Sequence, residues 1–148
     1  MPIAQLNVAR FRRSKADPAN QAFMDALEHV NAQADAADGF IWRLVGEGDA
    51  TDATAIEAVA GDADFIVNLS VWRDVPSLEA FAYRQADHRA VLARRSEWFE
   101  PMEPSLALWE VPEGHIPSVA EALEKLAQMG REGPSTSVFT FRWWRENR

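Results

Sequence analysis

The amino-acid sequence predicts one α+β domain that spans residues 1–148. A chain of this length is about the size of one domain and buries a core without covalent cross-links. Segments of strand-like alternation are separated by segments whose apolar residues recur every three or four positions. The chain has no cysteine, so disulfides and thiolate metal sites are excluded as sources of stability.

The first part of the chain predicts a strand, a helix and a second strand. Residues 3–10 (IAQLNVAR) alternate in the manner of a strand. Residues 17–37 predict a helix, because Asp17 is a cap candidate, Pro18 suits a first turn and apolar residues recur at helical spacing. Residues 39–45 (GFIWRLV) are apolar and aromatic, which predicts the second strand.

The middle of the chain predicts a loop, a strand and a second helix. Residues 46–64 are acidic and rich in small residues, which predicts the longest and most mobile loop and leaves open whether it closes over a pocket. Residues 65–72 (FIVNLSVW) are rich in β-branched residues and predict the clearest strand. Between Asp74 and Pro101 the apolar spacing is helical, and a break is expected near Asp87.

The last part of the chain predicts a strand, a helix and a strand. Residues 105–112 form the first of these, and the capping box from Ser118 to Glu121 opens the helix. Residues 137–144 (SVFTFRWW) predict the last strand. The first six elements follow the β-α-β-β-α-β order of the ferredoxin-like fold, so the last helix and strand are C-terminal additions to it.

The strand at residues 65–72 presents one fully apolar face and one mixed face. The members of the mixed face are Ile66, Asn68, Ser70 and Trp72. We expect the apolar face to pack under the two helices of the ferredoxin-like unit, and the mixed face to line a cavity or an interface. The alternative is that the polar residues only bond to loops. Which face of residues 39–45 points to the helices is left open.

Six segments of the chain carry a resemblance to a known family: IAQLNVAR, GFIWRL, NLSVW, FAYRQADHRAVLARRSEWFE, LWEVPEGHIPSVAEAL and GPSTSVFTF. From about residue 2 to residue 142 the chain resembles Domain of Unknown Function 3291. The resemblance implies a dimeric α+β barrel, in which two ferredoxin-like sheets face each other, and it implies no activity. The barrel superfamily includes cofactor-free quinone-forming monooxygenases, haem-degrading monooxygenases and proteins without known chemistry.

Three functions remain open at this point. One is a cofactor-independent monooxygenase-like enzyme that takes a small aromatic or polyketide-like ligand. Another is a non-catalytic ligand-binding or stress-related accessory protein. The third is a haem-binding or haem-degrading protein, which is the only one of the three that needs a cofactor. Fold alone does not choose among them.

The candidate catalytic residues are His88 and Asn7, and the candidate ligand-binding residues are Asn68, Trp72, Tyr83 and Arg43. His88 lies near the expected helix break, where a histidine serves either as an acid or base in a pocket or as a structural tie. By the resemblance, Asn7, Tyr83 or Phe81, and His88 loosely occupy the places of three residues in haem-degrading enzymes. The aromatic residue of those enzymes is a tryptophan, which this chain lacks there. No metal site is expected.

Composition restricts the partners. A net charge of −8 and an isoelectric point near 4.8 argue against nucleic acid. The sequence has no apolar run long enough to span a membrane and no secretory signal pattern, which predicts a cytoplasmic protein. Four tryptophans fall on predicted strands and favour a shared sheet face, hence a homodimer: Trp42, Trp72, Trp109 and Trp143.

Overall fold

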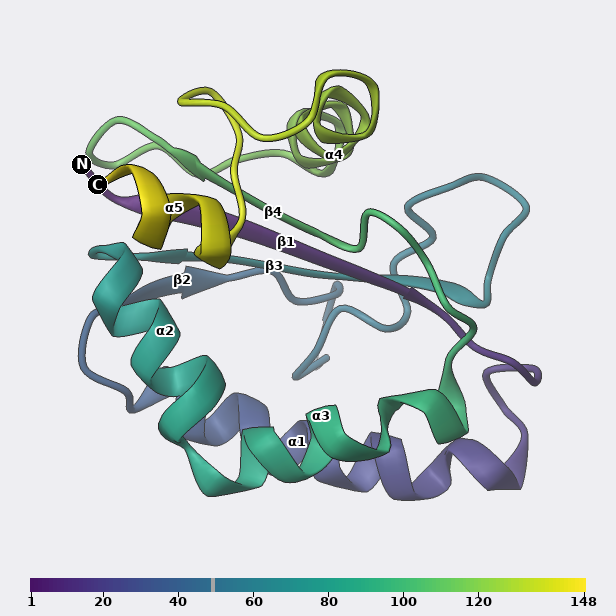
Figure 1. Cartoon of the computed structure of the whole chain (residues 1–148). Coiled ribbons are helices and arrows are strands. Elements are labelled where there is room, and N and C mark those ends of the chain that lie inside the picture. Colours follow the sequence, from purple (N-terminus) through teal and green to yellow (C-terminus); the bar gives the residue numbers. More distant parts are fainter. Residues whose placement is uncertain (49) are drawn as a thin grey trace.

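An open antiparallel sheet with helices on both faces forms the protein (Figure 1). The computed structural model describes residues 1–48 and 50–148, without the side chains of Ala86 and Asp87. The sheet has four strands in the order β2-β3-β1-β4, and all neighbouring pairs are antiparallel. The strands are β1 (Ile3–Arg10), β2 (Phe40–Arg43), β3 (Phe65–Trp72) and β4 (Leu106–Glu110). The helices are η1 (Pro18–Asn20), α1 (Gln21–Asp35), α2 (Val75–Arg84), α3 (Ala86–Trp98), α4 (Val119–Glu132) and α5 (Phe141–Asn147).

The predicted C-terminal strand at residues 137–144 is wrong. Residues 141–147 form α5, and the Thr140 hydroxyl caps this helix by accepting from the backbone N–H of Trp143 at 3.1 Å. Phe139 alone bridges to β4, through Leu108. Phe139, Phe141 and Trp143 alternate as in a strand, whereas Phe141 and Trp144 are spaced as on one face of a helix, so the short aromatic run is ambiguous. Trp143 therefore does not belong to a sheet face.

The predicted break in the second helix is confirmed and lies at Gln85. This residue has an extended backbone (φ −76°, ψ 118°), which ends α2 and begins α3. Its side-chain Oε1 accepts from the backbone N–H of His88 at 2.8 Å and so caps α3. The break turns the chain so that α2 and α3 follow each other at an angle below the sheet (Figure 1).

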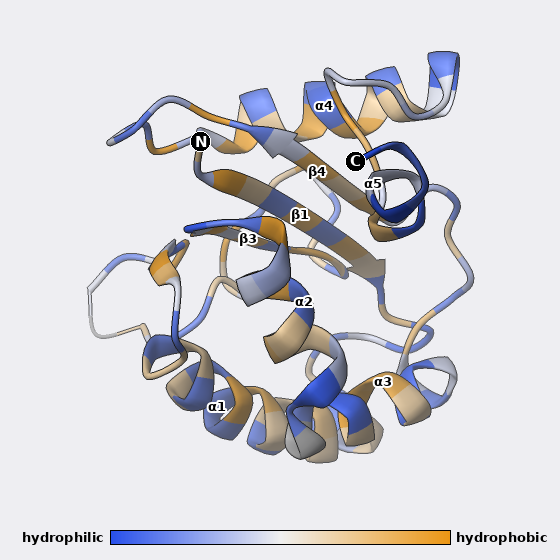
Figure 2. Cartoon of the chain, turned by 60° about the vertical axis from the view of Figure 1, so that its left-hand side comes forward, coloured by the Kyte–Doolittle hydropathy of each residue, from blue (hydrophilic) through white to orange (hydrophobic). Residues whose placement is uncertain are grey.

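The fully apolar face of the sheet packs against α4, and not under the first two helices as predicted. Side chains of β1, β3 and β4 on this face form one buried cluster with Ala122 and Met129 of α4. Figure 2 shows α4 over this face with its hydrophobic residues turned to the strands. The mixed face, which we expected to line a cavity or an interface, lies toward the first helices instead, and α4 of the same chain covers the apolar face. A homodimer stays a prediction, and it now rests on the resemblance alone.

The mixed face of the sheet lies toward α1, α2, α3 and α5, where two hydrophobic clusters form. The α2–α5 cluster covers one end and consists of Ile3, Ala34, Trp72, Val75, Leu78, Ala82, Leu108, Phe139 and Phe141, with Phe40, Phe81 and Leu106 packed against it. The α1–α3 cluster covers the other end and consists of Phe11, Phe23, Ile66 and Trp98, with Ala9, Leu27 and Val91 among the residues packed against it.

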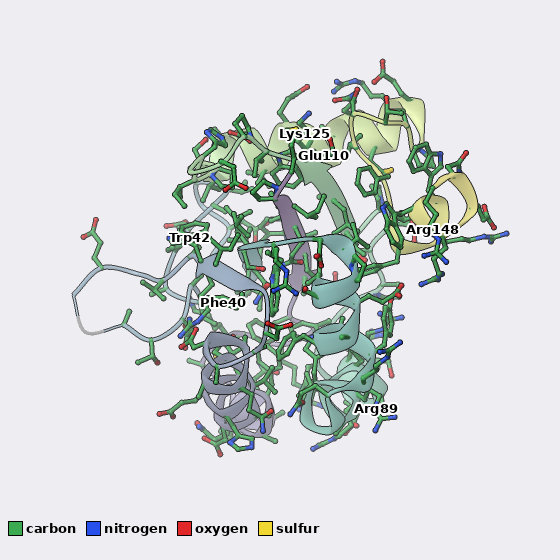
Figure 3. The ribbon with its side chains drawn as sticks, turned by 90° about the vertical axis from the view of Figure 1, so that its left-hand side faces the viewer. Phe40, Trp42, Arg89, Glu110, Lys125 and Arg148 are labelled. Atoms are coloured by element: carbon green, nitrogen blue, oxygen red, sulfur yellow. The ribbon has the colours of Figure 1, made fainter. Side chains whose placement is uncertain are left out.

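A register shift in β2 decides which of its side chains face these helices. Phe40 pairs with Trp72 and Trp42 pairs with Val71, so Ile41 is an extra residue in β2. Phe40 consequently packs in the α2–α5 cluster and Trp42 packs on the α4 side (Figure 3). Arg43 pairs with Ser70 and returns to the helix side.

The acidic loop at residues 46–64 is anchored at several points, and residue 49 lies outside the described residues. The Lys15 ammonium donates to the backbone carbonyl of Thr54 at 2.8 Å, and Arg10 forms an ion pair with Asp62. Ala58 packs against the cluster under α4. Around Ala58 the loop therefore contacts the apolar face. Its mobility stays a prediction.

Across the described ranges, no helix has the length and apolarity that a membrane span requires.

Candidate functional site

Polar side chains interrupt the mixed face of the two inner strands at the same level. β1 runs from Ile3 in the α2–α5 cluster to Ala9 at the α1–α3 cluster, and Gln5 and Asn7 lie between them. In β3, Asn68 and Ser70 likewise lie between Trp72 and Ile66. The pairs Gln5–Ser70 and Asn7–Asn68 are direct cross-strand partners, so the four side chains adjoin one another.

The helices above this part of the sheet carry polar residues at matching positions. Asn31 of α1 is 7% exposed and follows Leu27 of the α1–α3 cluster by four residues, while Ala34 of the α2–α5 cluster comes three residues later. These spacings place Asn31 on the inward face of α1.

His88 of α3, like Asn31 of α1, lies on the inward face of its helix between the two clusters. It precedes Val91 by three residues, so it shares the inward face of α3 with a member of the α1–α3 cluster. Its ring also packs on Phe81 at 5.1 Å between centroids, and Phe81 belongs to the α2–α5 cluster. His88 thus lies between the clusters, as the strand amides do.

We call the six residues between the two clusters the polar belt: Gln5, Asn7, Asn31, Asn68, Ser70 and His88. Gln5 and Ser70 are buried at its floor, but Asn7 and Asn68 are exposed although they lie near the middle of the two inner strands. Solvent therefore reaches the centre of a sheet face whose ends are closed by apolar clusters. A small molecule that enters here meets amides, a hydroxyl and an imidazole.

Hydrogen bonds connect the floor of the belt to the aromatic cluster. Gln5 Nε2 donates to Asn68 Oδ1 at 2.6 Å and to Ser70 Oγ at 2.8 Å, and it lies 3.3 Å from the backbone carbonyl oxygen of Asn68. The Trp72 indole N–H also donates to Ser70 Oγ, at 2.9 Å. The network holds Asn68 in a fixed orientation because its amide oxygen is already engaged.

His88 is held by the end of α2. Its Nδ1 lies 2.8 Å from the backbone carbonyl oxygen of Ala82, which only accepts, so Nδ1 carries the hydrogen. Burial lowers the pKa of His88 below its ordinary value, and the bond to Ala82 opposes this shift only in part. The neutral ring therefore bears a lone pair on Nε2, and Nε2 has no hydrogen-bond partner among the described residues.

The other predicted ligand-binding residues lie outside the belt. Trp72 is 1% exposed and stacks on Phe81 at 5.3 Å between centroids, so it is a wall behind Ser70 and not a contact surface. Tyr83 is 46% exposed and contacts Phe141 of α5. Arg43 is bound by Asp35, with Nε and Oδ1 2.7 Å apart, and also donates to the backbone carbonyl of Thr51. Of the six predicted residues, Asn7 and Asn68 therefore adjoin each other across the strands, and His88 lies on α3 between the same two clusters.

Asn31 is the belt residue that the sequence analysis did not single out. It follows Val30 and lies within the apolar stripe of α1, where an amide is out of place. A single polar residue in a helical stripe is a weak signal, and the sheet residues that it faces are distant in sequence.

The belt offers a haem group one nitrogen ligand for its iron, His88 Nε2, but no cationic partner for its propionates. Its described side chains are neutral amides, a hydroxyl and an imidazole, so the belt itself offers no cation to the haem propionates. Arg43, near Ser70 in register, is already neutralised by Asp35. Elsewhere in residues 1–48 and 50–148, no cluster of three or more His, Asp or Glu side chains is arranged to hold a metal ion.

The fold and the belt together define a ferredoxin-like α+β protein with a polar site between its sheet and its helices. The chain belongs to the family described as Domain of unknown function (DUF3291), whose model matches residues 2–147. A comparison with curated proteins found no match.

Solved structures with the same fold come from several organisms. A conserved protein from Methanosarcina mazei Go1 is 15% identical with a TM-score of 0.56, and the match covers 76% of this chain and 94% of that one. A Nitrosomonas europaea protein assigned as an antibiotic biosynthesis monooxygenase is 13% identical with a TM-score of 0.56, covering 76% and 92%. Rv0793 from Mycobacterium tuberculosis is 15% identical with a TM-score of 0.56, covering 78% and 100%. At these identities the similarity shows the fold alone.

Proposed function

We propose that this protein binds a small, neutral organic molecule at the polar belt. The observation that carries the proposal is the exposure of Asn7 and Asn68 near the middle of the inner strands, on a face that is otherwise buried. Asparagine is depleted in strands, and apolar residues at these two positions would join the two clusters into one core. Keeping amides there costs stability, which is typical of a functional site.

The composition of the belt supports a neutral ligand with aromatic or aliphatic parts. Binding sites for small molecules combine apolar walls with a few convergent polar groups. Here the walls are the two clusters, with Phe81 and Leu106 among the partly exposed members of one and Leu27 and Val91 among those of the other. The polar groups of the belt bear no charge at neutral pH, so they favour hydrogen-bonding groups over ions.

A second candidate function is cofactor-independent oxygenation of a hydroxyaromatic ligand at the same site. The specific observation is the lone pair on His88 Nε2, which can take the proton of a phenolic hydroxyl. The reaction with O2 needs no reductant, because the substrate supplies all four electrons. One oxygen atom becomes the new carbonyl oxygen of a quinone, and the other leaves as water with the hydrogens of the substrate O–H and C–H bonds. The Nitrosomonas europaea neighbour, assigned as a monooxygenase, adds an analogy of fold.

Mass spectrometry of molecules that remain bound through purification tests the binding proposal. We expect a small neutral molecule with the wild-type protein and none with Asn7→Leu, which fills the belt. Glu110→Leu is the matched control, since Glu110 is an exposed residue at the end of β4 outside the belt, and it should keep the molecule. Equal amounts in all three proteins would argue against the belt as the binding site.

Oxygen uptake with a bound hydroxyaromatic molecule separates the enzyme from the non-catalytic accessory protein. Oxygenation predicts one O2 consumed for each quinone formed, and a loss of about hundredfold in rate for His88→Gln. Binding without uptake above the rate in free solution would support the accessory function and reject oxygenation.

A further inference from the structure

Two backbone carbonyl groups fix the direction of hydrogen bonds in the belt, one on the sheet and one on the helices. The first is the carbonyl of Asn68, whose oxygen lies 3.3 Å from the side-chain nitrogen of Gln5. A carbonyl oxygen only accepts, so the Gln5 atom at this position is the amide nitrogen, whose two hydrogens point to the nearer acceptors Asn68 Oδ1 and Ser70 Oγ. Turning the Gln5 amide around would place two oxygens in contact.

This assignment determines what Asn68 and Ser70 offer to the belt. The Asn68 amide oxygen accepts from Gln5 at 2.6 Å, so its NH2 group points away from Gln5 and has no partner among the described residues. Ser70 Oγ accepts from Gln5 at 2.8 Å and from the Trp72 indole at 2.9 Å. Its own hydroxyl hydrogen is therefore left over as a donor.

The second carbonyl is that of Ala82, in the last turn of α2. Because it accepts from His88 Nδ1 at 2.8 Å, the neutral imidazole keeps its lone pair on Nε2. Among the belt residues whose own hydrogen bonds fix their orientation, Asn68 and Ser70 on the sheet thus present donors and His88 on the helices presents an acceptor. The site has two poles of opposite hydrogen-bonding character.

We infer that the belt binds a neutral hydroxyl-and-carbonyl compound, with the carbonyl oxygen on the Asn68 amide and the hydroxyl donating to His88 Nε2. This inference rests on the proposed binding function and narrows its ligand class. A ligand with donors at both ends leaves the Asn68 NH2 unpaired, and a ligand with acceptors at both ends leaves its own second acceptor against the His88 lone pair. Polar groups that a bound ligand removes from water without pairing are costly, so both mismatches weaken binding.

Three probes with one bicyclic skeleton test the two poles without changing the protein. 6-Hydroxy-1-tetralone carries both groups, 6-methoxy-1-tetralone lacks the hydroxyl hydrogen, and 5,6,7,8-tetrahydro-2-naphthol lacks the carbonyl. In calorimetric titrations of the full chain at pH 7.5, the hydroxyketone should bind about tenfold more tightly than either of the others. Equal affinities for the three probes would overturn the inferred arrangement of donor and acceptor groups, but would still agree with binding at the belt. No binding of any probe at millimolar concentration would count against the binding function as well.

A substitution at Asn68 tests the donor pole. Asn68→Asp keeps an oxygen that accepts from Gln5 but replaces the NH2 group by a second acceptor, with almost no change in shape. The preference for 6-hydroxy-1-tetralone over 5,6,7,8-tetrahydro-2-naphthol should vanish in this variant and persist in Gln128→Glu, which makes the same change of charge on α4. An unchanged preference in Asn68→Asp would overturn the inference.

Discussion

Replacing Asn7 by leucine should stabilise the protein and abolish its binding function at the same time. Asn7 is exposed between two apolar clusters, and its neighbours across the strands are Asn68 and the half-buried Leu106. A leucine at this position reaches from one cluster toward the other and removes apolar area from water. The polar amide that it replaces makes no hydrogen bond to a described residue.

The magnitude follows from the area that a leucine side chain would bury. Complete burial contributes about 1.5–3 kcal/mol, and an exposed position that becomes partly covered gains about 1 kcal/mol. For a domain of this size, such a gain raises Tm by roughly 3–5 °C. Filling the belt should also weaken binding of 6-hydroxy-1-tetralone by about tenfold or more, because the side chain takes the place of the ligand.

Urea unfolding and thermal unfolding measure the stability of Asn7→Leu, and calorimetric titration measures its affinity for 6-hydroxy-1-tetralone. Glu110→Leu serves as the control and should change the free energy of unfolding by no more than about 0.5 kcal/mol, as is usual at exposed positions. A destabilisation of Asn7→Leu by more than about 1 kcal/mol would refute the reasoning, because Asn7 would then be a structural residue.

Three further predictions concern His88, Trp72 and assembly. Burial lowers the pKa of His88, so the folded protein resists protonation of this ring. The free energy of unfolding should therefore be highest above about pH 6.5 and should fall as the pH drops below that value. In urea unfolding, His88→Gln should flatten this pH dependence, and equal slopes for the two proteins would contradict the burial of the ring. Trp72→Phe should lower the free energy of unfolding by about 1–2 kcal/mol, because it removes a buried indole and the hydrogen bond of that indole to Ser70. An unchanged free energy of unfolding would contradict the place of Trp72 in the core. The resemblance predicts a homodimer, so light scattering at micromolar protein should give twice the 16.6 kDa of one chain. The dimer interface must avoid the sheet face that α4 covers. A strict monomer would reject the homodimer.

The ends of two strands could be predicted from the sequence because their patterns are local. β1 and β3 have the predicted ends, Ile3–Arg10 and Phe65–Trp72, and the helix break lies within two residues of its expected position. The C-terminal helix α5 was missed because a short run of aromatic residues satisfies both periods, and the cap at Thr140 decides between them only in the folded chain.

The orientation of the sheet could not be read from the sequence. A mixed face and an apolar face are both compatible with covering helices. Which helix covers which face depends on packing between segments that are distant in the sequence, and α4 covers the apolar face. The composition of the belt could not be read from the sequence for the same reason. Asn7 and Asn68 are visible as polar residues in strands, but Asn31 and His88 join them only through tertiary packing.

The most direct test of a ligand site at the belt is a nitrogen–proton NMR titration that follows side-chain amide groups. Addition of 6-hydroxy-1-tetralone should shift the NH2 signals of Asn7, Asn31 and Asn68 together, with one common affinity, and should leave the signal of Gln128 on α4 unchanged. Shifts confined to the α4 side of the sheet, or no shift of the three asparagines at saturation, would contradict the proposed site.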